Sequence, residues 1–305
     1  MVGLSTAWFL QEHGVEVTVI DRQRVAAGAS LGNAGWLTPG IATPLPEPAV
    51  LNYGIRAVFS PNSPVYVPPS ANRDFIRFVT GFMRHSTMTA WKKAMTSLVP
   101  INDLSLGAFE TLSDGGVQAR AYDAEPFTAA YENIEERTTL LEEIQHIHAS
   151  GGDISFDVID GARARELVPA LSDEIACAII LHGQKYIHPG EFVTALGESV
   201  VARGGRIVEG KAVQSLRDMG RSVLVETDAA TADQFDQVVI ASGAWLPLLA
   251  KQHGIRHVVQ AGRGYSFSVA MDEVPKAPVY FPTRRVALTP LGDRLRVAGM
   301  MEFRR

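Results

Sequence analysis

The stretch that decides the fold is Val15-Glu16-Val17-Thr18-Val19-Ile20-Asp21, which directly follows Gly14. Its β-branched residues predict a β-strand that ends on a carboxylate. Residues 3–13 carry apolar side chains at helical spacing, and Gly14 can end that helix in the left-handed conformation. A helix, a glycine and a hydrophobic strand ending in an acid are typical of the second half of a nucleotide-binding βαβ unit.

Asp21 is the first candidate binding residue. An acid at the end of the second strand of such a unit can accept hydrogen bonds from both ribose hydroxyls of an adenosine. A carboxylate also repels a 2′-phosphate, which favours FAD or NAD over NADP. Only the last glycine of a G-x-G-x-x-G pattern, Gly3, lies within the chain, so a strand-end cap stays the alternative role for Asp21.

The second candidate is the loop Gly28-Ala29-Ser30-Leu31-Gly32-Asn33-Ala34-Gly35. Its small residues can bring backbone N–H groups against a pyrophosphate or the edge of a flavin. Gly28-x-Ser30-x-Gly32 also matches the nucleophile elbow of serine hydrolases, but that motif needs a hydrophobic strand directly before it. A loop without a ligand is the third interpretation.

The third candidate lies at residues 237–244, Gln-Val-Val-Ile-Ala-Ser-Gly-Ala. Residues 237–241 predict a buried strand, and the small residues after it would let the chain pass close to a cofactor. A plain turn from strand to helix would look similar.

Composition limits the function classes. The 28 basic and 33 acidic residues leave a net charge of −5, which argues against a nucleic-acid partner. Cys177 is the only cysteine, so an internal disulfide is impossible and a reducing compartment, the cytoplasm, is predicted. His146 and His148 point in different directions on a predicted helix, and we assign no metal site.

Further helices are predicted at 72–85, 132–150, 162–168 and 189–203, and strands at 206–209, 211–217, 221–227, 258–260, 265–269, 286–289 and 294–297.

Together these motifs resemble the D-amino-acid oxidase superfamily of FAD-dependent oxidoreductases, and within it the small subunits of bacterial D-amino-acid dehydrogenases. The resemblance runs through the whole chain with the motifs in family order. Its further matches are Tyr186-Ile187-His188-Pro189, Gly262-Arg263-Gly264-Tyr265, Ala241-Ser242-Gly243-Ala244-Trp245 and Val286-Ala287-Leu288-Thr289-Pro290-Leu291-Gly292.

The resemblance implies an α/β (α+β overall) fold, with a Rossmann-like FAD-binding domain interleaved with an antiparallel β-sheet substrate domain. The expected limits are 1–72 plus 145–255 for the FAD domain and 73–144 plus 256–305 for the substrate domain. Similar enzymes move a hydride from the α-carbon of a D-amino acid to FAD, and pass the electrons to quinone or oxygen. Peripheral association with the inner membrane is left open.

By position, the resemblance also implies binding residues. Gly3 would lie at the pyrophosphate, and Asp21 and Arg22 at the ribose. The backbone of Val213 would meet the adenine, and Met301 is a candidate for the substrate pocket. Two loops would line the diphosphate, ribityl and flavin: Ser30, Asn33, Ala34 and Gly35, and Ala241, Ser242 and Gly243.

The chain departs from the family pattern at both ends, where the first strand with its leading glycines and the C-terminal flavin-covering segment are not found. We therefore expect weak FAD binding and impaired activity in the chain as given. The alternatives are a glycine- or sarcosine-oxidase-like enzyme, a non-catalytic fragment and, more remotely, a serine hydrolase that uses Ser30.

Overall fold

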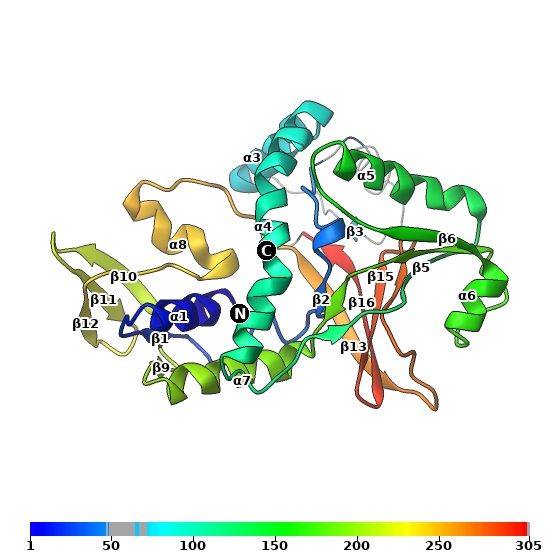
Figure 1. Ribbon diagram of the computed structural model, residues 1–305. Helices are drawn as coiled ribbons and strands as arrows, with labels where there is room; N and C mark the ends of the chain where they lie inside the picture. The colour runs from blue at the N-terminus through cyan, green and yellow to red at the C-terminus, as the bar shows by residue number, and fades with distance from the viewer. Residues whose placement is uncertain (47, 49–64, 67–71, 304–305) are drawn as a thin grey trace. The chain divides into compact units, whose positions relative to one another are not determined.

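The computed structural model describes residues 1–46, 48, 65–66 and 72–303, and the chain forms two compact units (Figure 1). The first unit comprises Met1–Leu31, Leu112–Arg120 and Pro189–Ala261. The second unit comprises Gly32–Thr111, Ala121–His188 and Gly262–Arg305. The predicted mixture of a helix–strand part and a largely antiparallel sheet part is confirmed.

The first unit contains two parallel helix–strand pairs. Helix α1 (Val2–Glu12) leads through Gly14 into β1 (Thr18–Ile20), and α7 (Pro189–Ala202) leads through Gly204 into β9 (Arg206–Val208). Both glycines have positive φ, +73° and +86°, the conformation that ends a helix at little steric cost. The two strands pair in parallel, with Val19 opposite Ile207. The predicted helix before Gly14 is therefore confirmed, and so is the predicted strand that ends next to Asp21.

Contacts between α1 and α7 fix the spacing of these pairs. The Trp8 side chain is only 1% exposed, and its indole N–H donates to Ser199 Oγ at 3.0 Å. Gln11 Nε2 donates to the carbonyl of Val200 at 3.0 Å. Large buried area and a satisfied indole N–H make Trp8 the anchor of this helix pair.

The remainder of the first unit is a meander followed by short helices. The antiparallel strands are β10 (Val213–Asp218), β11 (Val223–Thr227) and β12 (Ala232–Phe235). After them come η3 (Gly243–Trp245), α8 (Leu246–Ala250) and η4 (Lys251–His253).

Two strand predictions in this unit are wrong, since residues 258–260 are not a strand and neither is the longer segment before them. Residues 237–241 are not a strand, and Val239 is 62% exposed rather than buried. The apolar β-branched pattern reports what the side chains favour, whereas a strand also needs a neighbour for its backbone N–H and C=O groups. No strand in the described part of the chain pairs with these residues.

The second unit is built on a sheet of eight strands. Its neighbours run in the order β13-β16-β15-β14-β5-β7-β6, and β3 pairs with the end of β16. The bounds are β3 (Val65–Tyr66), β5 (Phe127–Tyr131), β6 (Phe156–Asp160), β7 (Cys177–Leu181), β13 (Arg263–Ala270), β14 (Val279–Phe281), β15 (Val286–Leu291) and β16 (Arg294–Glu302).

Helices cover both faces of the middle of this sheet. On one face, α5 (Thr138–His148) packs Ile144 against Phe127 and Ile179. On the other, α6 (Gly161–Leu167) packs Ala164 against Ala130 and the neighbouring apolar residues. Strands β5 and β7 are buried along their whole length, since both of their faces are covered.

The remaining elements of this unit are short, except for two helices. They are η1 (Pro39–Ile41), α3 (Arg73–His85), α4 (Met88–Asp114), η2 (Ile134–Arg137) and the three strands of a small sheet, β2 (Trp36–Leu37), β8 (Lys185–Tyr186) and β4 (Tyr122–Asp123).

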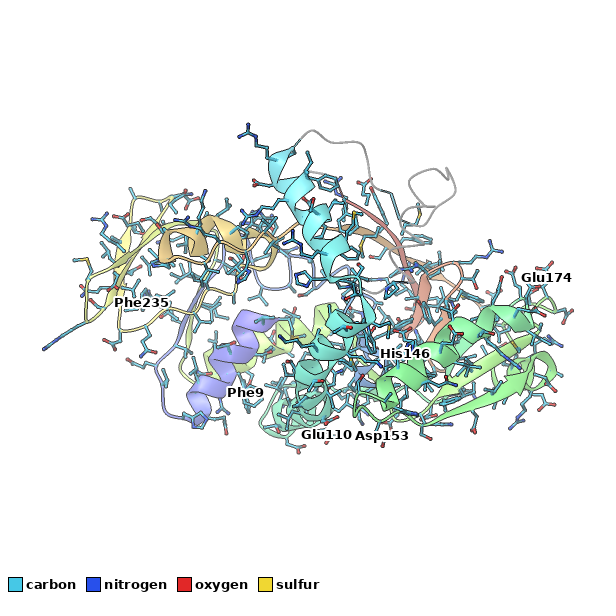
Figure 2. All side chains as sticks on the ribbon, turned by 90° about the horizontal axis from the view of Figure 1, so that it is seen from above. Phe9, Glu110, His146, Asp153, Glu174 and Phe235 are labelled. Atoms are coloured by element: carbon cyan, nitrogen blue, oxygen red, sulfur yellow. The ribbon has the colours of Figure 1, made fainter. Side chains whose placement is uncertain are left out.

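The two histidines of α5 have separate structural contacts. His146, labelled in Figure 2, packs edge-on against Trp91 with ring centroids 6.0 Å apart. A ring nitrogen of His148, Nε2, lies 3.0 Å from the carbonyl oxygen of Ile154. Each ring therefore supports the packing of α5 independently.

The compact units do not follow the predicted domain limits. The pairing of β2 with β8 and of β6 with β7 places residues 32–37 and 156–186 in the second unit, whereas both had been expected in the FAD domain. Two-residue strands such as β2 give too short a pattern to be recognised in a sequence. The limits of 1–72 plus 145–255 and 73–144 plus 256–305 stay a prediction about domains.

Close packing restricts Gly161 at the start of α6. Its N–H donates to the carbonyl of Ala176 at 2.8 Å, and a Cβ added there would lie 1.9 Å from the Ile175 carbonyl oxygen. Because that neighbour is backbone, no rotamer change can relieve the collision.

We expect Gly161→Ala to lower the free energy of unfolding by about 2–3 kcal/mol, because β7 and α6 must move apart. Gly107→Ala is the matched control, since a Cβ at Gly107 in α4 meets nothing within 4 Å. That control should gain up to about 1 kcal/mol through helix propensity. Urea unfolding curves measure both, and equal midpoints for the two variants would refute the packing argument.

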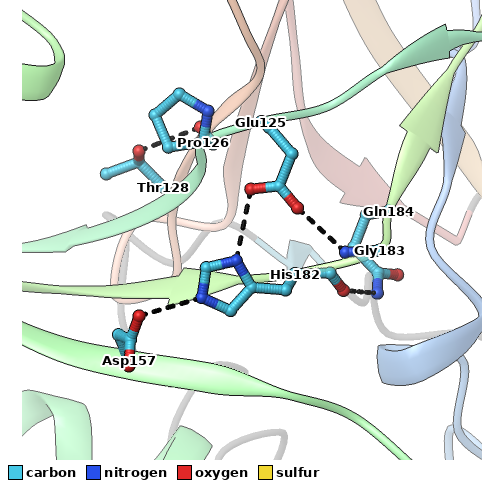
Figure 3. A network of polar contacts seen from close by, with 7 residues as sticks. All are labelled: Glu125, Pro126, Thr128, Asp157, His182, Gly183 and Gln184. Carbon is cyan, nitrogen blue, oxygen red and sulfur yellow. Dashed lines mark hydrogen bonds and ion pairs between the residues drawn. The ribbon is translucent and has the colours of Figure 1, made fainter.

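A histidine joins three neighbouring segments of the sheet (Figure 3). His182 follows β7, and its Nδ1 lies 3.2 Å from Oε2 of Glu125, which precedes β5. Its Nε2 lies 3.0 Å from Oδ2 of Asp157 on β6. Both ring nitrogens face carboxylate oxygens, so both bonds form fully only when the ring is the doubly protonated imidazolium. The hydrogen bond to Asp157, and then that to Glu125 with both charges, raises the pKa of His182.

Because the folded pKa of His182 is raised, its contribution to stability is full below the unfolded value of about 6.5 and is lost as the pH rises through the folded pKa. We expect the stability difference between wild type and His182→Gln to shrink with rising pH over that window. The side chains are at least 36% exposed, so each pair contributes under about 1 kcal/mol. Urea unfolding across pH measures the difference.

Asp157→Asn is the matched control, because it keeps the histidine but removes one carboxylate, and it should weaken the same pH dependence. A His182→Gln effect that is constant across pH would show that the ring acts by packing alone.

Candidate cofactor-binding site

Asp21 lies where β1 ends, at the carboxyl edge of the parallel pair. Its N–H donates to the carbonyl of Val208 at 2.9 Å, and its carbonyl accepts from Lys211 at 3.1 Å. One carboxylate oxygen, Oδ1, accepts from the N–H of Gln23 at 2.8 Å and closes a tight turn. The side chain is exposed, so the turn holds the carboxylate while leaving it accessible to a ligand.

The first turn of α1 lies close to this carboxylate. Burial lowers the pKa of the Met1 amino group, and the charge of Asp21 opposes that shift, as expected for groups near one another. Among the described residues no side chain caps α1, and its first turn carries no acid, so its leading N–H groups can serve an anion. A Cβ added at Gly3 would meet Ala241 Cβ at 3.4 Å, which brings residue 241 to the same place.

The turn after residue 241 carries an unsatisfied polar atom. Ser242 Oγ is buried and has no hydrogen-bond partner in the described part of the chain. Gly243 has a φ of +54°, and Trp245 N–H donates to the Ser242 carbonyl at 3.0 Å. A buried hydroxyl without a partner costs free energy, which a ligand with polar groups can recover.

Arg22 and Trp245 link the two turns. The Arg22 guanidinium carbon lies 3.7 Å from the centroid of the Trp245 ring, a cation–π contact. The structure therefore brings Gly3, Asp21, Arg22 and the 241–243 turn together within the first unit.

The other predicted residues of this unit are less closely connected. Val213 begins β10 and pairs with Thr227 across the meander. Ser30 lies half-buried in the turn that follows Gly28. No hydrogen bond joins either residue to Asp21 within the described residues.

The surroundings of Ser30 do not support the hydrolase alternative. A nucleophile elbow needs a strand directly before it. Here β1 ends at Ile20, and residues 21–35 form turns and bends without a strand.

Asn33, Ala34 and Gly35 belong to the second unit, where they form a tightly held loop. Asn33 Oδ1 accepts from the Gly35 N–H at 2.7 Å, and the Gly35 carbonyl accepts from Ile187 at 2.8 Å. Gly35 is buried with φ +85°, which a residue with a Cβ rarely adopts. Ala34 is half-buried between them. The loop is thus held by its own hydrogen bonds, and its binding role stays a prediction.

Two residues that sequence reasoning missed hold this loop on the sheet. Arg296 Nη1 donates to the Asn33 carbonyl at 3.3 Å, and its Nε donates to Ser268 Oγ at 2.9 Å. Trp36 donates its indole N–H to Thr289 Oγ1 at 2.9 Å. Asn33 and Arg296 are 263 positions apart, and no local pattern marks such a pair.

Met301, the predicted substrate-pocket residue, lies near the end of β16. It is 39% exposed and pairs with Gly264 of β13. A Cβ added at Gly262 would lie 3.2 Å from the Met301 sulfur, so this glycine leaves room for the thioether.

Three groups with raised pKa values lie in the core of the second unit. Burial raises the pKa of Glu143, whose Oε1 accepts from Thr43 Oγ1 at 2.8 Å, and burial also raises the pKa values of Tyr131 and Tyr280. Perturbed groups mark active sites or buried structural networks. These residues belong to or pack against the α5–sheet core, which favours the structural role.

Comparison with known proteins identifies the family of the chain. The model of the DAO family, described as FAD dependent oxidoreductase, matches residues 1–305. The chain belongs to the DAO family of FAD-dependent oxidoreductases.

Relatives named D-amino acid dehydrogenase match almost the whole chain, and two of them serve as examples. One, from Rhizorhabdus wittichii, is 28% identical over 99% of this chain and 74% of its own length. The other, from Cereibacter sphaeroides, is 29% identical over 99% of this chain and 70% of its own.

Solved structures show the same fold. Glycine oxidase from Bacillus cereus matches with a TM-score of 0.65 and 20% identity over 98% of this chain and 70% of that one. L-α-glycerophosphate oxidase from Mycoplasma pneumoniae, solved with FAD bound, matches with a TM-score of 0.67 and 17% identity over 98% and 68%.

The residues present fit the FAD that this family uses. An uncapped helix start, an exposed carboxylate at a strand end and a buried hydroxyl without a partner suit the phosphates, the ribose and further polar atoms of a dinucleotide. When bound, FAD supplies the acceptor for a hydride, and the chain binds and orients it.

We expect Asp21→Asn to weaken FAD binding about tenfold to a hundredfold, because a hydrogen bond to a charged group contributes about 1.5–3 kcal/mol. Equilibrium dialysis followed by flavin absorbance gives the dissociation constants. Asp236→Asn is the control, since it makes the same charge change at an exposed position of the same unit. Equal affinities of wild type and Asp21→Asn would exclude a ribose-binding role.

Proposed function

We propose that this oxidoreductase oxidises D-amino acids to 2-oxo acids and ammonia. The observation that carries the proposal is the identity of 28–29% to relatives named D-amino acid dehydrogenase across 99% of the chain. The similarity includes both units, so it extends beyond the cofactor-binding residues.

In the proposed reaction the α-carbon would give up a hydride, for which bound FAD would supply the acceptor, and the amine would give up a proton, which leaves an imino acid. Water then hydrolyses the imino acid to the 2-oxo acid and ammonia. Asp21 would hold the adenosine ribose, and the start of α1 would hold the pyrophosphate. The Asn33–Gly35 loop would lie along the diphosphate and flavin. Met301 is proposed for the substrate pocket, and its partial exposure supports that role. We assign no catalytic acid or base.

A glycine- or sarcosine-oxidase-like activity is the second candidate. It is favoured by the fold likeness to glycine oxidase, which at 20% identity concerns the fold alone. The D-amino acid assignment has the stronger support, because the relatives that carry that name share more residues with this chain.

We also propose that the 305-residue chain binds FAD weakly when expressed by itself. The exposed Val239 and the two-stranded parallel sheet of β1 and β9 support this, because a nucleotide-binding sheet normally has more strands to hold its loops. Stoichiometric flavin absorbance in the purified chain would contradict the proposal.

The electron acceptor, quinone or oxygen, stays a prediction, and so does peripheral membrane association. A cytoplasmic location is likewise proposed from the single cysteine, Cys177, which is buried. No helix among the described residues is long and apolar enough to cross a membrane.

The substrate is tested by turnover with added FAD. We expect D-alanine to be oxidised faster than glycine, sarcosine or L-alanine, because the relatives at 28–29% identity are named D-amino acid dehydrogenase. Reduction of a redox dye and production of hydrogen peroxide, measured in parallel, separate a dehydrogenase from an oxidase. Faster turnover of glycine or sarcosine would replace the first proposal with the second.

A further inference from the structure

Strand β13 forms one edge of the eight-stranded sheet. It pairs with β16 along its whole length, and no other strand in the described part of the chain pairs with it. Backbone N–H and C=O groups on the outer side of such a strand are a template for a further strand. Edge strands are often protected by a proline or a charged side chain, whereas residues 264–271 contain neither. The edge is therefore suited to pairing.

One face of β13 is engaged by its own unit, and the other face is exposed. On the first face Ser268 Oγ accepts from Arg296 Nε at 2.9 Å, and Ser266 and Ser268 are both half-buried. The alternate side chains on the other face are apolar or aromatic and are 49%, 60% and 37% exposed: Tyr265, Phe267 and Val269. Three such side chains in a row form an apolar strip along the edge of the sheet.

The sequence of this strip is nearly symmetric about Phe267. Residues 265–269 read Tyr-Ser-Phe-Ser-Val, so a serine and then an apolar or aromatic residue stand on each side of the phenylalanine. A two-fold interface requires a surface that is complementary to itself. Two such strands, antiparallel about an axis at Phe267, would place the exposed strips side by side and serine opposite serine. A slip of one residue would set the exposed strip opposite serines.

We propose that β13 pairs with β13 of a second copy of the chain, antiparallel about a two-fold axis at Phe267, and so joins the two sheets of a homodimer. The charges at the strand ends favour this occupant. Antiparallel pairing brings the start of each strand to the end of the other, so Arg263 of one copy lies near Asp272 and Glu273 of the second copy. All three side chains are exposed.

The net charge of −5 on each chain opposes association only weakly, because salt screens exposed charges beyond about 8 Å under physiological conditions. The edge strand is also held in its extended form before pairing. Tyr265 Oη donates to Glu302 on β16 at 2.8 Å. The Ser268 carbonyl accepts from Arg294 Nη2 at 2.8 Å, and a carbonyl oxygen can accept a second bond. Pairing therefore orders few groups, and its affinity would come from backbone hydrogen bonds and apolar contact.

Sedimentation velocity of the 305-residue chain measures the dimer. We expect a reversible dimer whose fraction grows between about 1 and 200 µM. Phe267→Lys should raise the dissociation constant at least about tenfold, because two like charges would then meet at the axis. Leu104→Lys is the matched control, since it makes a similar change at a side chain of α4 that is 73% exposed, and it should leave the dimer unchanged.

A cysteine placed on the axis tests the register. The native Cys177 is 1% exposed and should not react. Phe267→Cys should form a disulfide-linked dimer on oxidation, because the two Cα atoms of residue 267 would lie about 4.5–5.5 Å apart. Tyr265→Cys should run as a monomer on a non-reducing gel, since the residue opposite it would be Val269 of the second copy.

Circular dichroism and thermal unfolding show whether each variant folds. A chain that stays monomeric at about 200 µM would overturn the proposal, and so would a dimer that Phe267→Lys leaves intact. Equal cross-linking of Tyr265→Cys and Phe267→Cys would exclude the axis at Phe267. Dimerisation needs neither FAD nor substrate, so its outcome is separate from that of the proposed dehydrogenase activity.

Discussion

The parallel pairing of β1 with β9 is the constraint on which the cofactor site depends. Three residue pairs from Thr18 to Ile20 align the ends of the two strands, so that the Asp21 backbone bonds to both Val208 and Lys211. With its backbone held twice, Asp21 presents its carboxylate at one place. The packing of α1 on α7 through Trp8 then sets where the uncapped helix start lies relative to that carboxylate. The candidate nucleotide site thus rests on a small parallel sheet and one helix pair.

In the second unit the candidate loop does not lie at the start of a helix, so other contacts must hold its conformation. Residues 32–37 are held from the far end of the chain, by Arg296 on the Asn33 carbonyl and by Thr289 under the Trp36 indole. These contacts tie the loop to β15 and β16, so that the sheet core supports its conformation. Gly35 has a φ of +85°, which glycine adopts at little steric cost, and its N–H and carbonyl bond to Asn33 and Ile187.

The sequence was sufficient where local patterns decide the structure. The helix before Gly14, the strand before Asp21 and the helix after Asn72 all follow from side-chain spacing and, for the first helix, from the glycine that ends it. It failed at residues 237–241, since side-chain preference says nothing about whether the backbone finds a neighbouring strand. It also could not identify Arg296, or the contact of Arg22 with Trp245, because such pairs form only through the three-dimensional arrangement of segments distant in sequence.

The unsatisfied groups of the first unit connect its stability to its function. The buried Ser242 hydroxyl has no partner among the described residues, which costs free energy in the folded state, and the leading N–H groups of α1 have no side-chain cap, which leaves them to water or a ligand. A ligand that satisfies them stabilises the folded unit in proportion to its affinity. The Asn33–Gly35 loop, by contrast, has its backbone bonds satisfied by its own unit. A cofactor that bonds to Ser242 would therefore stabilise the first unit, whereas the Asn33–Gly35 loop already has partners within the second unit.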